Sequence, residues 1–87
     1  MADYFCNQYD LRVKQSSIDS VYKEIGKRIK AARSSKGMSQ EQLATESGID
    51  RTHMGFIEQG RRKPTLSTLI KIVGSLNMSL EELFKHL

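Results

Sequence analysis

The sequence has few of the residues that cross-link small proteins. It contains 87 residues with one cysteine, Cys6, and no tryptophan. A single cysteine excludes an internal disulfide and a cysteine-based zinc site, and no cysteine or acidic partner lies at metal-ligand spacing from His53 or His86. We therefore expect no metal, no cofactor and a reducing compartment.

Long apolar runs are also absent. No segment approaches the roughly 20 apolar residues that a membrane-spanning helix needs. The N-terminus, with Asp3 and Asp10 and no apolar centre, does not resemble a signal peptide. We expect a cytoplasmic protein without a membrane partner. With 38% hydrophobic residues and one proline, the chain can build one small core.

Positive charge is concentrated in two stretches, although the net charge is only +4. Residues 23–36 carry six basic residues against one acidic residue, and residues 60–74 carry four basic residues against none. A positive surface of this kind suits a polyanion, whereas solvated lysines and arginines on helices are the commoner explanation for any single one.

Local signals predict five helices and no sheet in the core. Ser39, Asp50 and Ser79 each follow one apolar residue and precede another by four positions, which is the hydrophobic staple of a helix start. Thr65, directly after Pro64, is a weaker start. Helix ends are expected at the glycines that follow helical runs, Gly37, Gly48 and Gly60.

Apolar spacing sets the expected extent of the helices. The first covers about residues 19–36, with a stripe of Val21, Ile25, Ile29 and Ala32. The fourth has a stripe of Leu66, Leu69, Ile70 and Val73. We expect residues 1–17 to form a tail or arm and residues 18–87 to form the domain. Only "YDLRVK", near the N-terminus, alternates in the manner of a strand.

The second and third expected helices are joined by "SGI", a short glycine turn typical of the helix-turn-helix unit. The segment "MSQEQLATESGIDRTHMGFIEQGRRKP" resembles the DNA-binding motif of the Cro and lambda-repressor (Xre) family of bacterial and phage regulators. The residues that carry the resemblance are Gln40, Leu43, Ala44, Gly48, Ile57, Glu58 and Gly60. Within that family, "DRTHMGFIEQGRRKP" is most similar to restriction-modification controller proteins.

The resemblance covers residues 21–87 and implies an all-α, five-helix lambda-repressor-like domain. It also implies a sequence-specific transcriptional regulator that binds double-stranded DNA with a recognition helix at about residues 50–59. In the helix-turn-helix unit this second helix lies in the major groove, with its N-terminal residues against base edges. We expect a homodimer on a palindromic operator, because one small domain makes too few contacts for tight specificity.

The outward face of the recognition helix supplies the candidate base contacts. Arg51 and Thr52 come first, and arginine is the commonest bidentate reader of guanine. Gly55 costs about 1 kcal/mol in a helix interior relative to alanine, which indicates close approach of the backbone to another surface. Phe56 either touches thymine methyl groups or packs against a neighbouring loop. The candidate base-contacting residues are Arg51, Thr52, Gly55, Phe56 and Arg62.

Phosphate contacts are expected on both sides of the recognition helix. Gln40 combines an amide donor with the positive end of a helix dipole, and family members use this position for the DNA backbone. The alternatives are that Gln40 is only a good first-turn residue and that "RRK" is a solvated loop. The candidate phosphate-contacting residues are Ser39, Gln40, His53, Gln59, Arg61 and Lys63.

Two further groups have expected structural roles. Arg33 and Glu58 border apolar stripes, and the resemblance implies an ion pair between the first and third helices. Apolar residues in the C-terminal helix exceed its own packing needs and either form a dimer interface or complete the monomer core; they are Leu80, Leu83, Phe84 and Leu87. Aromatic and apolar residues of the N-terminus are alternative dimer contacts, namely Tyr4, Phe5, Tyr9 and Val13.

The alternative function is an antitoxin-like or other protein-interaction module of the same fold. A lack of binding to random duplex DNA at low salt would favour that alternative. We do not expect an enzyme, because no nucleophile, base and orienting group converge and Cys6 has no partner. No small-molecule ligand is indicated.

Overall fold

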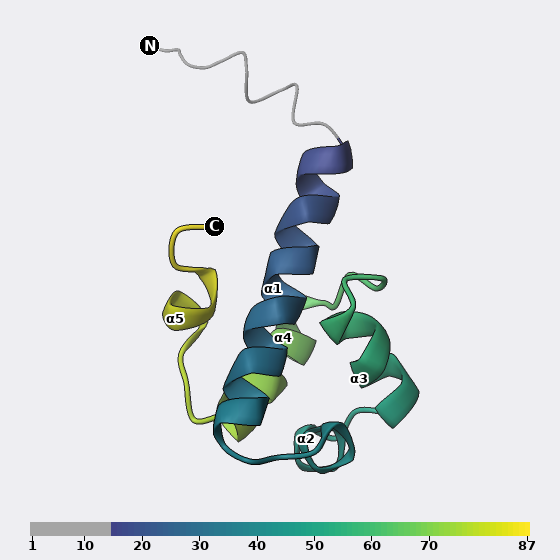
Figure 1. The fold of residues 1–87 in the computed structure, drawn as a ribbon, viewed down its shortest axis with the longest axis vertical. Helices are drawn as coiled ribbons and strands as arrows, with labels where there is room; N and C mark the ends of the chain where they lie inside the picture. The colour runs from purple at the N-terminus through teal and green to yellow at the C-terminus, as the bar shows by residue number, and fades with distance from the viewer. Residues whose placement is uncertain (1–14) are drawn as a thin grey trace.

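The computed structural model describes residues 15–87 as five helices packed around one core (Figure 1). The helices are α1 (Gln15–Ser35), α2 (Gln40–Ser47), α3 (Arg51–Glu58), α4 (Leu66–Ser75) and α5 (Leu80–Phe84). This part of the chain contains no strand, so the expected all-α, five-helix class is confirmed. In Figure 1, α3 and α5 lie on opposite sides of α1. Across residues 15–87, every helix falls short of the length and apolar character that a membrane span requires.

Four of the five helix starts agree with the sequence-based expectation. Ser39, Asp50, Thr65 and Ser79 are N-cap residues whose side chains accept hydrogen bonds from backbone N–H groups of the first turn. Ser39 and Ser79 also form the reciprocal bonds of a capping box. The order of short polar caps along the chain therefore fixes where these helices begin.

The start of α1 differs from the expectation. The helix begins at Gln15, before the expected position 19, so residues 15–17 of the expected tail or arm are helical. Neither glycine nor proline occurs between Gln15 and Asp19, and nothing local ends the helix there. The "YDLRVK" segment and the N-terminal aromatic residues considered above lie outside the described residues.

Glycine turns end the first three helices as expected. Gly37, Gly48 and Gly60 have φ angles of +70°, +69° and +74°, the left-handed region that glycine adopts at little steric cost. After α3, the N–H of Gly60 donates to the carbonyl of Ile57 at 3.0 Å and that of Arg61 donates to Phe56 at 2.9 Å. This pair of bonds is a Schellman motif, and it turns residues 61–63 back beside the helix.

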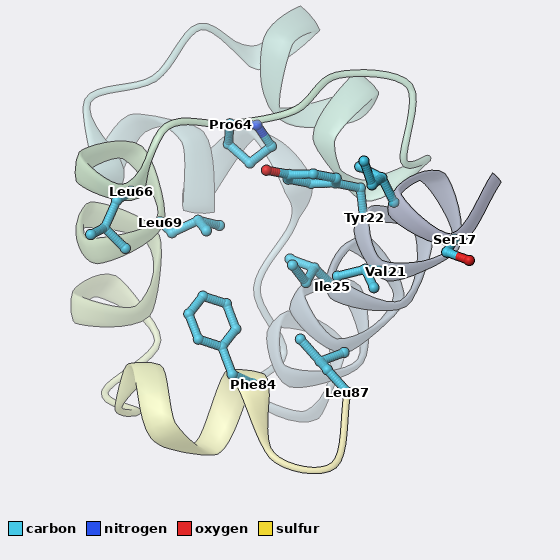
Figure 2. Close-up of a pocket in the computed structure, with 10 residues that line it drawn as sticks. Ser17, Val21, Tyr22, Ile25, Pro64, Leu66, Leu69, Phe84 and Leu87 are labelled. Carbon is cyan, nitrogen blue, oxygen red and sulfur yellow. The ribbon is translucent and has the colours of Figure 1, made fainter. Parts of the chain in front are cut away.

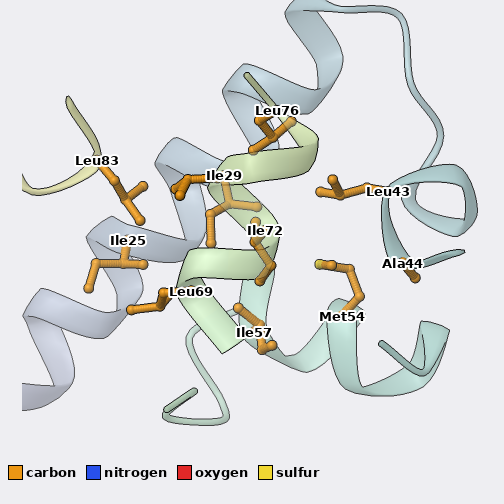
Figure 3. Close-up of a cluster of buried hydrophobic side chains, with 11 residues drawn as sticks. Ile25, Ile29, Leu43, Ala44, Met54, Ile57, Leu69, Ile72, Leu76 and Leu83 are labelled. Atoms are coloured by element: carbon orange, nitrogen blue, oxygen red, sulfur yellow. The ribbon is translucent and has the colours of Figure 1, made fainter. Parts of the chain in front are cut away.

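The core joins all five helices (Figure 3). Its buried members are Ile25, Ile29, Leu43, Ala44, Met54, Ile57, Leu69, Ile72, Val73, Leu76 and Leu83. In α4 the expected stripe is partly wrong, because Leu66 is 59% exposed and Ile70 is 50% exposed. The buried side chains of α4 are Leu69, Ile72 and Val73, whereas Leu66 and Ile70 lie on the surface.

The C-terminal helix is attached to α1 by both packing and hydrogen bonds. Leu83 has no exposed surface, so it completes the monomer core and is not available as the expected dimer contact. Nη1 of Arg28 donates to the carbonyl of Leu83 at 2.9 Å and to that of Lys85, while Nε of Arg28 pairs with Glu24 at 3.1 Å. One arginine of the basic stretch is therefore engaged inside the fold.

The backbones of α1 and α3 approach each other closely at Gly26. A Cβ atom placed on Gly26 would lie 2.5 Å from the carbonyl oxygens of Ile57 and Glu58. No side chain fits at that separation, so the glycine sets how closely the last turn of α3 packs on α1.

Candidate nucleic-acid interface

The second and third helices form a helix-turn-helix unit around an apolar interface. Residues 48–50 connect α2 to α3, and the two helices cross steeply in Figure 1. Leu43 and Ala44 of α2 are buried against Met54 and Ile57 of α3. Because these residues use the inner side of α3, its opposite side faces outward.

The expected outward residues do lie together. Arg51, Thr52 and His53 are exposed in the first turn of α3, and Gln59 is exposed at its end. Together with neighbouring residues they surround one shallow hollow, whose lining is Gln40, Arg51, Thr52, Gly55, Phe56 and Gln59. Arginine, hydroxyl and amide groups therefore converge on one exposed surface, which suits hydrogen bonding to a polar ligand.

Gly55 has a different role from the one expected. It is buried, and a Cβ atom added to it would lie 3.3 Å from Oε1 of Gln40. The surface that its backbone approaches is therefore the side chain of Gln40, which covers it from α2. The expected base contact at Gly55 is corrected accordingly, although the inference of a close approach was sound.

An internal hydrogen-bond network fixes that glutamine. Arg33 donates two hydrogen bonds to the carboxylate of Glu58, from Nε to Oε2 at 2.8 Å and from Nη2 to Oε1 at 3.1 Å. Nε2 of Gln40 donates a third hydrogen bond, to Oε1 of Glu58 at 3.0 Å. Nη1 of Arg33 also donates to the carbonyl of Met38 at 2.9 Å. The network thus connects α1, α2 and α3 through one carboxylate.

The ion pair expected between Arg33 and Glu58 is therefore present, and it is almost fully shielded from solvent. The Arg33 side chain is 12% exposed and that of Glu58 is 2% exposed. The hydrogen bonds from its guanidinium to Glu58 raise the pKa of Arg33, with burial acting in the opposite direction. The third partner, Gln40, was not expected from the sequence, because it lies on a different helix from Glu58 and no periodic spacing links the two residues.

Phe56 is half-buried beneath two arginines from the loop that follows α3. The guanidinium carbon of Arg61 lies 4.9 Å from the centroid of the Phe56 ring, and that of Arg62 lies 5.4 Å from it. Arg61 also donates from Nη1 to Oε1 of Gln59 at 3.3 Å. Phe56 therefore packs against a neighbouring loop, which is one of the two alternatives considered for it.

The remaining candidate phosphate contacts are partly engaged within the protein. Nζ of Lys63 lies 3.3 Å from Oδ1 of Asp19 in α1, and both side chains are about half exposed. The hydroxyl of Ser39 accepts the N–H of Gln42 at 3.0 Å. The carboxylate of Asp50 accepts the backbone N–H groups of Thr52 and His53, at 3.0 and 3.2 Å. An anion beside α3 would therefore meet side chains more readily than backbone donors.

A separate apolar surface lies away from the outward face of α3. Residues of α1, α4 and α5 line an open cleft, in which Val21, Tyr22, Leu66 and Phe84 surround an empty space (Figure 2). Leu87 is 46% exposed at its edge. Of the expected dimer residues, Phe84 and Leu87 line this cleft together with residues of α1 and α4, whereas Leu80 is half-buried outside its lining.

Comparison with known proteins gives consistent matches over this region. Residues 29–83 match the family model described as Helix-turn-helix. Over 59 residues the sequence is 44% identical to "Control protein C.SmaI" of Serratia marcescens, covering 68% of this chain and 70% of that protein. It is 38% identical over 56 residues to the "Immunity repressor protein" of Bacillus phage phi105, covering 64% of this chain and 39% of that protein.

The fold also matches solved structures. The crystal structure of the restriction-modification controller protein C.AhdI from Aeromonas hydrophila aligns with a TM-score of 0.73 and 37% sequence identity, covering 75% of this chain and 98% of that one. The sequence and structure comparisons therefore point to the same helix-turn-helix unit.

Proposed function

Since this chain belongs to the helix-turn-helix family of DNA-binding transcriptional regulators, we propose that it binds a palindromic operator as a homodimer. The observation that carries the proposal is the division of α3 into a packed side and an exposed side. Met54 and Ile57 hold the helix in the core, while Arg51 and Thr52 project from its first turn. In this unit, the N-terminal residues of the second helix are those that reach base edges. The family consists of regulators and not of enzymes.

Arg51, Thr52 and Arg62 are the proposed base contacts. A guanidinium in the first turn of α3 can donate to both acceptors of one guanine, and the threonine offers a hydroxyl and a methyl group. The proposed phosphate contacts flank the groove and are Ser39, Gln40, His53, Gln59, Arg61 and Lys63. Gln40 contributes its backbone N–H, which a helix cannot satisfy at its first position, while its side chain stays on Glu58.

The proposed dimer forms through the exposed apolar surface of α4 and α5. Leu66 and Ile70 are at least half exposed on α4, and Leu87 is 46% exposed after α5. Leu66 and Leu87 line the same cleft, and Ile70 lies one turn after Leu66 on α4. Exposed apolar surface of this kind is typical of a protein contact. Because α5 and α3 lie on opposite sides of α1 (Figure 1), a contact through this face leaves α3 free. The two recognition helices would then enter the major groove at half-sites about one helical turn apart.

A controller-type regulator is the subfamily that we propose. C.SmaI and C.AhdI, two of the matched proteins, are named a control protein and a controller protein, and C.AhdI matches over 98% of its length. A regulator of this kind acts on DNA in the cytoplasm, which is the compartment that we propose for this protein.

The test begins with the selection of bound sequences from a random duplex library. A single palindromic consensus should emerge, and wild-type protein should bind it far more tightly than random duplex. If no sequence is enriched and random duplex is not bound at low salt, the proposal is wrong and a protein-interaction module becomes the better interpretation.

Substitutions then separate base reading from phosphate binding. Arg51→Ala should lose about 1 to 3 kcal/mol of discrimination at one operator position per half-site. Lys63→Ala should leave the preferred sequence unchanged and reduce the salt slope of binding by about one unit per subunit or less, since Asp19 already neutralises part of its charge. A uniform loss over all operator variants for Arg51→Ala would place that residue on the DNA backbone.

A further inference from the structure

The loop after α3 carries two positive charges that share one aromatic ring. Arg61 and Arg62 are exposed, and both guanidinium groups lie within cation–π distance of Phe56. Within residues 15–87, neither arginine forms an ion pair with an acidic side chain. Two like charges repel each other, so a site that brings both guanidinium groups over one ring favours the approach of an anion.

The position of the ring connects these charges to the outward face of α3. Phe56 lines the same hollow as Arg51 and Thr52. It also lines a second hollow with His53 and Arg62. The ring therefore lies between the outward face of α3 and the loop, and the two loop arginines lie at the edge of that face.

We propose that Phe56 is a positioning residue that holds Arg61 and Arg62 ready for acceptor oxygens of the DNA, a role that rests on the proposed DNA-binding function. A guanidinium that lies over a ring interacts through its flat face, which leaves the N–H groups at its edge available. In Arg61 one of these groups, on Nη1, donates to Oε1 of Gln59 at 3.3 Å, and the others remain for an acceptor. Those N–H groups can then take a phosphate or a base edge in a bidentate manner. Phe56 acts through the arginines and makes no base contact of its own.

The Schellman turn supports this arrangement from the backbone. The N–H of Arg61 donates to the carbonyl of Phe56 at 2.9 Å, so the loop is fixed to the same residue that carries the ring. Gly60 cannot carry a side chain there, because an added Cβ atom would lie 2.6 Å from Cγ of Lys23 in α1. Backbone and ring together limit the conformations open to the two arginines before DNA arrives, which lowers the entropy lost on binding.

The first measurement concerns the free protein. Ring currents of Phe56 should shift the side-chain proton resonances of Arg61 and Arg62 upfield in NMR spectra. Phe56→Leu, which keeps an apolar side chain without a ring, should abolish the shifts, and Phe56→Tyr should restore them. Unshifted arginine resonances in the wild-type protein would overturn the proposal without any reference to DNA.

The second measurement is a mutant cycle on operator DNA. Phe56→Leu should weaken binding by about two- to fivefold per arginine and per subunit, and Phe56→Tyr should restore wild-type affinity. Circular dichroism should show that both variants are folded at the temperature of the binding assay. In an Arg61→Gln, Arg62→Gln background, Phe56→Leu should have no further effect on affinity.

The outcomes of the cycle distinguish the two proposals. If wild-type protein binds the operator and Phe56→Leu weakens the background variant as much as the wild type, the ring contacts DNA directly and the positioning role is wrong. If wild-type protein binds no duplex at all, the proposed function fails and the positioning role fails with it.

Discussion

Removal of the Glu58 carboxylate should destabilise the protein far more than removal of an exposed acidic residue. In Glu58→Ala the guanidinium of Arg33 stays buried at 12% exposure without its counterion, and Nε2 of Gln40 loses its acceptor. Breaking a buried pair by removing one partner costs about 3 to 5 kcal/mol. A domain of this length has a total stability of about 4 to 13 kcal/mol, so the variant should lose at least about a quarter of its stability.

Thermal unfolding followed by circular dichroism measures this difference. A loss of about 3 kcal/mol corresponds to a fall in melting temperature of at least about 12 °C in a domain of this size. Glu24→Ala is the matched control, because Glu24 forms an ion pair with Arg28 four residues along α1 and its side chain is 45% exposed. Such a pair contributes about 0.3 to 0.5 kcal/mol, so the control should melt within a few degrees of wild type.

Operator binding by Glu58→Ala should persist wherever the variant is still folded. Because the pKa of Arg33 is raised in the folded protein, the ion pair stabilises the fold fully at any pH below the ordinary arginine pKa. This stabilisation is lost only when the pH rises through the pKa that Arg33 has in the folded protein. The comparison can therefore be made at neutral pH without titration of the arginine. Unchanged melting together with lost binding would refute the reasoning and make Glu58 a direct DNA contact.

Two other predictions concern assembly and close packing. The wild-type protein should sediment at micromolar concentration as a dimer of twice 9.9 kDa, and Ile70→Glu should sediment as a 9.9 kDa monomer. The control Lys71→Glu, on the same helix, should remain dimeric. A dimeric Ile70→Glu variant would place the interface elsewhere. Gly26→Ala should lower stability by about 1 to 3 kcal/mol or more, because the added Cβ atom meets backbone at 2.5 Å. Gly55→Ala should melt near or above the wild-type temperature, because the added Cβ atom meets only the flexible Gln40 side chain, at 3.3 Å, and alanine favours the helix by about 1 kcal/mol. Equal melting temperatures of Gly26→Ala and Gly55→Ala would contradict the predicted difference.

Local chemistry made the helix starts and ends predictable from the sequence. A polar cap such as Ser39 and a left-handed glycine such as Gly48 act on backbone groups within a few residues, so their effect is visible in a short stretch of sequence. The position of Arg51 at the start of α3 followed from the same signals, because Asp50 fixes where that helix begins.

Periodicity alone did not determine which face of α4 is buried. Two sets of apolar residues in this segment have helical spacing. One is Leu66, Leu69, Ile70 and Val73, and the other is Leu69, Ile72, Val73 and Leu76. Only packing against the other helices selects the second set and leaves Leu66 and Ile70 exposed. Likewise, the basic stretch at residues 23–36 is less available to a polyanion than its charge suggests. Arg28 and Arg33 are both engaged in contacts within the fold.

Contacts between separate elements account for the differences at the site. Gln40 lies over Gly55 because α2 and α3 cross at that point, and no spacing rule links two residues on different helices. The placement of Arg61 and Arg62 over the Phe56 ring depends on the turn at Gly60, which brings the loop back beside α3. The residue types were visible in the sequence, whereas their partners were set by the tertiary structure.

The two sides of α3 differ in how freely they can change during evolution. In the described chain, Arg51 and Thr52 form no side-chain hydrogen bond, whereas Glu58 on the inner side holds three helices together. Substitutions at the two outward positions should leave folding nearly intact, since exposed residues without such contacts usually change stability by no more than about 0.5 kcal/mol. With the base contacts proposed above, single substitutions at Arg51 or Thr52 should therefore change the operator preference while the protein stays folded.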